Sequence, residues 1–182
     1  MTRAPDTNEA LDAPIDIAMT VDGARVATTV RPRHLLSDFL REAGVGGVHV
    51  ACGHGVCGAC TVAVDGVAVR ACLMLTVQAD GCVVQSVASL PALEGCSPGQ
   101  EGLTPLQAAF RQHHALQCGF CTPGLLVSTA LFLARRGTAN PSLAKPDLAR
   151  PDRDDILDHL NGHLCRCSGY ANIIAAIESV LA

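Results

Sequence analysis

Cysteine is the residue type in this chain with the clearest capacity for chemistry. The 182-residue sequence contains ten cysteines, and its 49% hydrophobic content is enough to build a core without disulfide support. Its N-terminus is polar and acidic, with no apolar segment and no twin arginine, so we expect no export signal. In a reducing compartment, so many cysteines indicate ligands of a metal or a cluster rather than disulfides.

Four cysteines in the N-terminal half follow the spacing C-x4-C-x2-C with a fourth cysteine further along. This is the pattern of a plant-type [2Fe–2S] ferredoxin, in which one tight loop supplies three thiolates and a separate element supplies the fourth. Glycines in the loop permit left-handed backbone conformations that turn N–H groups toward anionic sulfurs. The predicted ligands are Cys52, Cys57, Cys60 and Cys72.

Two alternatives to this cluster match the spacing less well. A structural zinc site also uses four thiolates, but zinc ribbons favour paired C-x2-C knuckles, and only the pair Cys57 and Cys60 has that spacing. A Rieske centre would use His54 as a ligand, but it needs a second Cys–His pair, and neither Cys60 nor Cys72 is followed shortly by a histidine.

The C-terminal half contains a second set, made of a C-x2-C pair and a later C-x-C pair: Cys118, Cys121, Cys165 and Cys167. The first pair lies just before a predicted helix, where the positive end of the helix dipole suits an anionic cluster. Spacing alone leaves a zinc site open, whereas a thioredoxin-like pair is disfavoured because no βαβ pattern surrounds it. Arg166 either offsets cluster charge or is an ordinary solvated side chain.

The elements that must position the first set form a small sheet packed on one helix. Alternating apolar residues and two Asp-Gly turns predict two hairpins and a last strand, and helical spacing predicts one helix between them. Together they indicate a β-grasp domain at 15–88, after a disordered lead at 1–14. The expected hairpins span 15–30 and 61–71, the helix 35–44 and the last strand 82–87.

The second half is predicted to be helical. Residues 89–102 contain proline and glycine without periodicity, and we interpret them as a linker. Thr-Pro pairs predict two helix starts, and apolar spacing predicts two further helices. These four helices span about 104–114, 122–136, 154–161 and 172–181. The predicted fold class is therefore α+β: an N-terminal β-grasp plant-type ferredoxin domain, then an all-α four-helix [2Fe–2S]-binding domain at 103–182.

Three motifs occur together in this chain. They are Cys-x4-Cys-Gly-Ala-Cys-Thr-Val, then Gln-Cys-Gly-Phe-Cys-Thr-Pro-Gly from Gln117, then His-Leu-Cys-Arg-Cys-Ser-Gly-Tyr from His163. In this order they resemble the iron–sulfur subunit of the molybdenum hydroxylases, the family of xanthine dehydrogenase, aldehyde oxidoreductase and aerobic carbon monoxide dehydrogenase. The resemblance runs from about Ile15 to the C-terminus.

The resemblance implies an electron-transfer subunit of a multi-subunit oxidoreductase. The Cys118 set would hold the [2Fe–2S] cluster proximal to a molybdopterin in its cytosine dinucleotide form, and the Cys52 set would hold the distal cluster facing FAD. Gln117 and Cys167 would contact the pterin. The implied partners are a large molybdopterin-binding subunit and a medium FAD-binding subunit, assembled in the cytoplasm as a dimer of heterotrimers.

Other sequence features exclude several functions. The formal net charge is −4 with a pI near 5.9 and no basic run, so nucleic acid and anionic membranes are poor partners. A Rossmann fingerprint, a P-loop and a nucleophile–base pair are all absent from the sequence. We therefore expect no catalytic residue on this chain, with substrate chemistry on a partner subunit.

The chain departs from the family pattern between Cys121 and Cys165, where the connection is longer than usual. The extra length lies at 137–152, rich in proline and charge, where we expect a surface insertion. Cys82 and Cys96 match no motif; we expect a small buried hydrophobe and a linker thiol, respectively. The alternative functions are a free-standing two-cluster electron carrier or redox sensor, and a structural zinc module.

Overall fold

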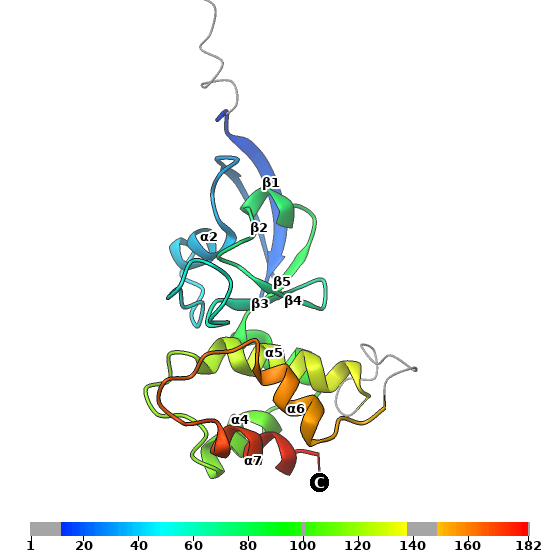
Figure 1. The fold of residues 1–182 in the computed structure, drawn as a ribbon. Helices are drawn as coiled ribbons and strands as arrows, with labels where there is room; N and C mark the ends of the chain where they lie inside the picture. The colour runs from blue at the N-terminus through cyan, green and yellow to red at the C-terminus, as the bar shows by residue number, and fades with distance from the viewer. Residues whose placement is uncertain (1–11, 100, 138–148, 182) are drawn as a thin grey trace, which may run out of the picture.

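The computed structural model describes residues 12–99, 101–137 and 149–181. These residues form two units, a sheet-containing one and a helical one, stacked end to end (Figure 1). Most of the lead predicted at 1–14, and residues 138–148 of the predicted insertion, lie outside the described residues.

The first unit is a five-stranded mixed sheet with the strand order β2-β1-β5-β3-β4. Strands β1 and β5 are parallel, and the other pairs are antiparallel. Helix α2 (Leu36–Glu42) packs on the sheet and buries Leu36 and Leu40 completely. This arrangement confirms the predicted β-grasp fold. The strands are β1 (Ile15–Val21), β2 (Ala24–Val30), β3 (Thr61–Val64), β4 (Val67–Arg70) and β5 (Val83–Gln85).

Both predicted Asp-Gly turns close hairpins. Asp22 and Gly23 have φ values of 47° and 84°, and Asp65 and Gly66 have values of 48° and 73°. Two consecutive residues with positive φ are what a type I′ turn requires, and its twist matches that of the flanking strands. The second hairpin matters for function because it carries Cys72, just after β4, back beside Cys60, just before β3.

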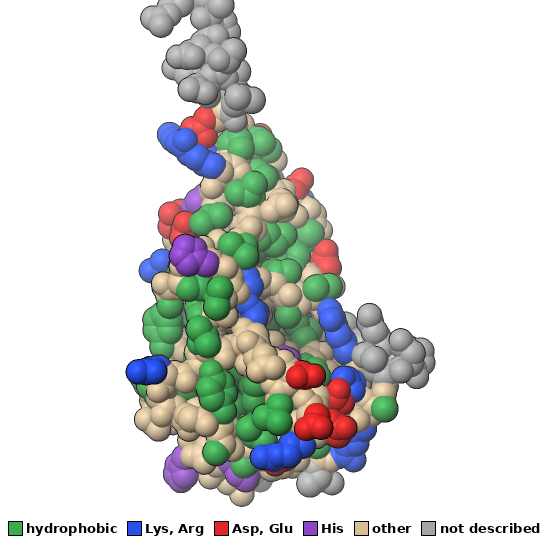
Figure 2. Space-filling model, viewed as in Figure 1, with side chains coloured by type: hydrophobic (Ala, Val, Ile, Leu, Met, Phe, Trp, Pro, Cys, Tyr) green, Lys and Arg blue, Asp and Glu red, His purple; other side chains and the backbone are tan. Residues whose placement is uncertain are grey.

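The second unit contains the four predicted helices. They are α4 (Pro105–Gln112), α5 (Thr122–Arg135), α6 (Arg153–Leu160) and α7 (Ala171–Ser179). Helix α5 is the central element, and ten of its fourteen residues are buried. Figure 2 shows acidic side chains gathered over α6, whereas α5 is mostly apolar and buried. Thr104 caps α4 through its hydroxyl, as its sequence predicts, whereas α5 begins with Cys121, not Thr122, at the N-cap.

The segment predicted as a linker contains a further short helix, α3 (Leu90–Glu94), which follows the 3-10 turn η2 (Val87–Ser89). Leu90 and Leu93 are buried in the same hydrophobic cluster as the core of the helical unit. A five-residue helix is too short for a 3.6-residue period to show in the sequence. This part of the connection therefore belongs to the core instead of merely joining two domains.

The two units pack directly on each other. Helix α5 lies across the end of the sheet that carries β3 (Figure 1), and Ala63 of β3 belongs to the hydrophobic cluster of the helical unit. Arg135, at the end of α5, donates a hydrogen bond to the Gly66 carbonyl at 3.2 Å. Among the described residues, no helix is long and apolar enough to cross a membrane.

Candidate metal centres

The first cysteine set lies in and beside the loop between α2 and β3. Three of its members are buried, with Cys57, Cys60 and Cys72 only 8%, 2% and 4% exposed. Cys60 and Cys72 meet because they flank the second hairpin, and the Ala71 N–H donates to the Cys60 carbonyl at 3.3 Å. The structure thus places the distant Cys72 beside Cys60 of the loop, and Cys57 interacts with both Cys52 and Cys60.

Backbone geometry makes the first loop a cradle for anionic sulfur. Gly53, Gly55 and Gly58 have φ values of 65°, 74° and 75°, the left-handed conformations predicted from the sequence. N–H groups of Cys57 and then of His54 point at the sulfur of Cys52 and lower its pKa to about 6. The Cys52 side chain is thereby prepared as a thiolate, the form that binds metal.

Burial acts in the opposite direction on Cys60. Loss of solvent raises the pKa of its thiol to about 11. A buried thiolate is stable only beside a positive charge, and iron supplies that charge when a cluster is bound. The loop therefore combines one thiol activated by N–H donors with others that depend on the metal.

The second cysteine set lies at one end of the helical unit. Cys118 and Cys121 precede α5, and Cys165 and Cys167 lie in the connection between α6 and α7. The sulfurs of Cys118 and Cys167 are 3.5 Å apart, and both residues are exposed. Burial, and then the neighbouring Cys165, raise the pKa of Cys121 to about 12.

Within each set the pKa shifts of the thiols identify the partners that interact two by two, and the sulfurs of Cys118 and Cys167 are in direct contact. The pairs are Cys52 with Cys57, Cys60 with Cys72, Cys118 with Cys167, and Cys121 with Cys165. A tetrahedral zinc site needs four ligands around one point, whereas a [2Fe–2S] rhomb takes two thiolates at each of two irons. The paired geometry fits the two-iron cluster.

The side chain of Gln117 links the two motifs of the helical unit. Its amide nitrogen donates to the Cys167 carbonyl at 3.1 Å. This bond uses one of the four hydrogen-bonding positions of the amide. Gln117, Cys118 and Cys167 are all exposed and form one continuous site. Arg166 is also exposed, which fits the solvated alternative for that side chain.

The two cysteine loops touch each other. The Leu164 N–H donates to the Cys57 carbonyl at 3.0 Å, and Leu164 directly precedes Cys165. A Cβ placed on Gly58 would come within 2.3 Å of Nδ1 of His163, so only glycine permits this approach. The sequence predicts both loops but not their contact, because nothing in the spacing of Leu164 or His163 distinguishes them from other loop residues.

Helix α5 approaches the first loop closely from the other side. A Cβ on Gly124 would lie 2.4 Å from the Gly58 carbonyl oxygen. Upstream of the helix, the His49 ring stacks on Phe120 with centroids 4.8 Å apart, and His49 Nδ1 lies 2.7 Å from the Phe120 carbonyl. The sequence signal of this contact is a glycine inside the helix that begins at Thr122.

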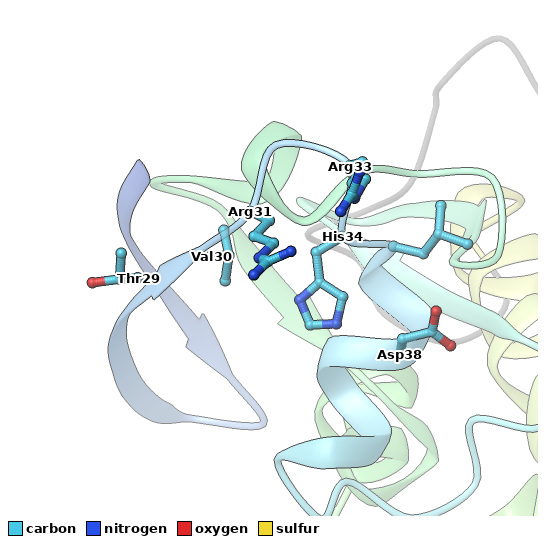
Figure 3. A pocket seen from close by; sticks show the side chains of 7 residues that line it. Thr29, Val30, Arg31, Arg33, His34 and Asp38 are labelled. Carbon is cyan, nitrogen blue, oxygen red and sulfur yellow. The ribbon is translucent and has the colours of Figure 1, made fainter. Parts of the chain in front are cut away.

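The remaining features belong to neither cysteine set. Cys82 packs against the core of the first unit, half-buried, and Cys96 follows α3; neither joins a ligand group. A hollow of about 510 Å³ lies where β2 ends and α2 begins (Figure 3), and no cysteine lines it. Its Arg31 and Arg33 share one carboxylate, that of Asp12, and Asp38 also lines the hollow, so two carboxylates match the two positive charges.

The fold and the two sets of four cysteines together define a two-domain iron–sulfur protein, and comparisons with known proteins agree. Residues 19–84 match the family of 2Fe-2S iron-sulfur cluster binding domains, and residues 92–178 match that of [2Fe-2S] binding domains. Caffeine dehydrogenase subunit gamma of Pseudomonas sp. (strain CBB1) is 46% identical over 165 residues, covering 90% of this chain and 89% of that protein.

Two further relatives extend the comparison. The nicotine 6-hydroxylase small subunit of Paenarthrobacter nicotinovorans is 43% identical over 164 residues, covering 90% of this chain and 87% of that protein. A chain of quinoline 2-oxidoreductase from Pseudomonas putida 86 is 40% identical with a TM-score of 0.74, covering 92% of this chain and 96% of that chain. The chain belongs to the family of iron–sulfur subunits of the molybdenum hydroxylases.

Proposed function

We propose that this chain carries electrons from a molybdenum centre on a large partner subunit, through two [2Fe–2S] clusters, to FAD on a medium partner subunit. Cys118, Cys121, Cys165 and Cys167 would hold the cluster nearer the molybdopterin. Cys52, Cys57, Cys60 and Cys72 would hold the cluster nearer the flavin. When bound, each cluster accepts and releases one electron at a time.

The observation that carries this proposal is the hydrogen bond between the two cysteine loops. From Cys165 the chain runs one residue back to Leu164, whose N–H donates to the carbonyl of Cys57 at 3.0 Å. A route between a ligand of one set and a ligand of the other thus crosses a single hydrogen bond. Gly58 and Gly124 keep this contact tight because neither leaves room for a side chain.

The exposed end of the helical unit suits a partner subunit that carries the pterin. Cys118 and Cys167 lie at the surface beside Gln117, and the neighbouring Leu116 and Phe120 are 41% and 43% exposed. Large apolar side chains in the open indicate a surface that another protein covers. We propose that Gln117 and Cys167 contact the pterin there.

The first loop has apolar neighbours of its own. Val56 and Leu73 are 60% and 59% exposed, and the Leu73 side chain lies close against Gly55 of that loop. We propose that the FAD-binding subunit covers this surface, so that the two partners occupy different ends of the electron path. The assembly would be a dimer of heterotrimers in the cytoplasm, with molybdopterin in its cytosine dinucleotide form.

The names of three relatives support a substrate class for the complex. Caffeine, nicotine and quinoline are all nitrogen heterocycles. We propose that the large partner subunit oxidises a nitrogen-containing aromatic ring and that this chain receives the electrons. No residue of this chain would touch the substrate.

Purification of the chain from its native source tests the subunit role against a free-standing carrier. We expect co-purification with a molybdenum-containing subunit, and reduction of the clusters on addition of an N-heterocyclic substrate. Isolation as a stable monomer with two intact clusters and no molybdenum partner would instead establish the carrier. A zinc-loaded chain would contradict both.

A further inference from the structure

The side chain of Arg70 bridges the two cysteine loops. Arg70 ends β4, two residues before Cys72, and is half-buried. Its Nε donates to the Gly55 carbonyl at 3.3 Å, within the first cysteine loop. On the other side, its Nη2 donates to the Gly162 carbonyl at 2.6 Å, in the turn that leads to Cys165. One guanidinium thus contacts both loops.

The third contact of Arg70 strengthens the same junction. Nη1 donates to the hydroxyl of Thr61 at 2.6 Å, and that hydroxyl donates to the Gly58 carbonyl at 2.6 Å. Gly58 also packs tightly against His163, because a Cβ on Gly58 would lie 2.3 Å from His163 Nδ1. The planar, rigid guanidinium makes three well-directed bonds here that an ammonium group cannot reproduce together.

All three acceptors of Arg70 are neutral oxygens. Among the residues that the structure describes, the ion pairs lie elsewhere, and no carboxylate pairs with this guanidinium. The charge of Arg70 acts on His159 and His163, and neither of these side chains can supply negative charge. The charge of Arg70 is therefore not neutralised by a carboxylate, and it can act on an anion held by the cysteine loop beside it.

The proposed clusters would be that anion. Two ferric irons, two sulfides and four thiolates sum to a doubly negative group, and the one-electron reduced form is triply negative. A fixed positive charge nearby therefore stabilises the reduced form more than the oxidised form, which raises the reduction potential. Arg70 lies two residues before Cys72 and donates a hydrogen bond to Gly55, between Cys52 and Cys57. Its charge should therefore raise the potential of the first cluster more than that of the second.

We propose that Arg70 is a positioning residue that holds the two cysteine loops together and, through its charge, raises the reduction potential of the cluster held by the Cys52 set. This inference rests on the proposed function. It gives the electron path a preferred direction, because a higher potential at the flavin-side cluster draws electrons away from the molybdenum side. Arg166, the cation nearest the ligands in sequence, is exposed, so solvent screens its charge.

Three variants of the full chain, loaded with both clusters, test the proposal. Arg70→Gln removes the charge and most of the donors, whereas Arg70→Lys keeps the charge. Arg135→Gln is the matched control, since Arg135 also donates from one unit to a carbonyl of the other, that of Gly66. It lies at the far end of α5, about 20 Å from the helix start beside Cys121.

The readout is a redox titration followed by EPR, which reports the two clusters separately. We expect Arg70→Gln to lower the equilibrium constant for reduction of the Cys52-set cluster about tenfold. This corresponds to a reduction potential lower by about 59 mV for one electron. The other cluster should shift less, and Arg70→Lys and Arg135→Gln should stay within about twofold of wild type.

Each outcome decides the matter. Unchanged potentials in Arg70→Gln, or an equal shift in Arg135→Gln, would overturn the proposal while leaving the proposed function intact. If Arg70→Gln does not fold, Arg70→Met replaces it, because it removes the charge and keeps an apolar stem: a tenfold fall supports the role of charge, and a wild-type potential contradicts it. Absence of iron from the wild-type chain would instead refute the proposed function itself.

Discussion

The two cysteine sets differ in where their sulfurs lie. The first set is largely enclosed within this chain, with Cys57, Cys60 and Cys72 all less than 10% exposed and Cys52 half-buried. The second set lies at the edge of the helical unit, with Cys118 and Cys167 at the surface. A site that its own chain encloses needs a partner only to receive the electrons. The exposed second set beside Gln117 is suited to being covered by another subunit.

The largest expected effect comes from removing one ligand of each set in turn. Cys60→Ser should lose one cluster and about half the iron, because a hydroxyl is a poor substitute for thiolate at iron. It should also destabilise the first unit, since Cys60 is part of that unit's core. Iron analysis and urea unfolding measure the two effects.

Cys167→Ser should lose the other half of the iron without destabilising the first unit, because Cys167 is exposed. Cys96→Ser serves as the control for both and should keep all the iron. Loss of both clusters in either ligand variant would show that the two sites are not independent.

Gly124→Ala should disrupt the packing of helix α5 against the first cysteine loop. Alanine favours a helix by about 1 kcal/mol over glycine, so any loss of stability must come from the contact with the Gly58 carbonyl. We expect unfolding to become easier by about 2–3 kcal/mol, as for an overpacked core. Gly46→Ala, where nothing lies within 4 Å, should change stability by less than about 0.5 kcal/mol. Equal effects in the two variants would show that the loops are not in tight contact.

The stability of the contact between the sheet-containing unit and the helical unit should also depend on pH. Burial, and then the charge of Arg70, lower the pKa of His159 to about 4. Between pH 6.5 and 4 the unfolded chain binds a proton that the folded chain does not, so stability falls as the pH falls through that range. The contribution of His159 should shrink by about 2 kcal/mol between pH 7 and 5.

Urea unfolding at several pH values measures this loss. His159→Gln removes the titrating group, so its stability should depend less on pH over the same range. An identical pH dependence in the variant and the wild type would assign the effect to other groups.

The smallest expected effect is at Gln117. Gln117→Ala removes one exposed hydrogen bond to Cys167, so the isolated chain should lose no more than about 1 kcal/mol of stability and no iron. Attachment of the molybdopterin subunit should weaken about fivefold for one lost hydrogen bond. Binding of that subunit to immobilised chain measures it, and unchanged binding would remove Gln117 from the partner surface.

Much of the fold is predictable because its signals are local. Asp22-Gly23 and Asp65-Gly66 specify their turns without help from the rest of the chain. Thr104 and Gln107 form a capping box at the start of α4. The spacing of the loop cysteines, and the left-handed glycines between them, likewise follow from a short stretch of sequence.

The junction between the regions is not predictable in this way. The contacts of Arg70 with Gly162 and of Leu164 with Cys57 join residues about ninety positions or more apart, and depend on how the two units pack. Helix α3 escapes prediction because five residues give too short a pattern. From the sequence, the candidate to offset cluster charge is Arg166, which lies between two ligands. In the three-dimensional structure, Arg70 is the arginine that contacts both cysteine loops.

The most direct test of the account is metal analysis combined with EPR of the dithionite-reduced chain. Two cysteine sets of this geometry predict about four irons per chain, no zinc, and two distinct S = 1/2 signals. Cys60→Ser should abolish one signal and Cys167→Ser the other. Zinc in place of iron, or a single signal that both variants abolish, would contradict the account.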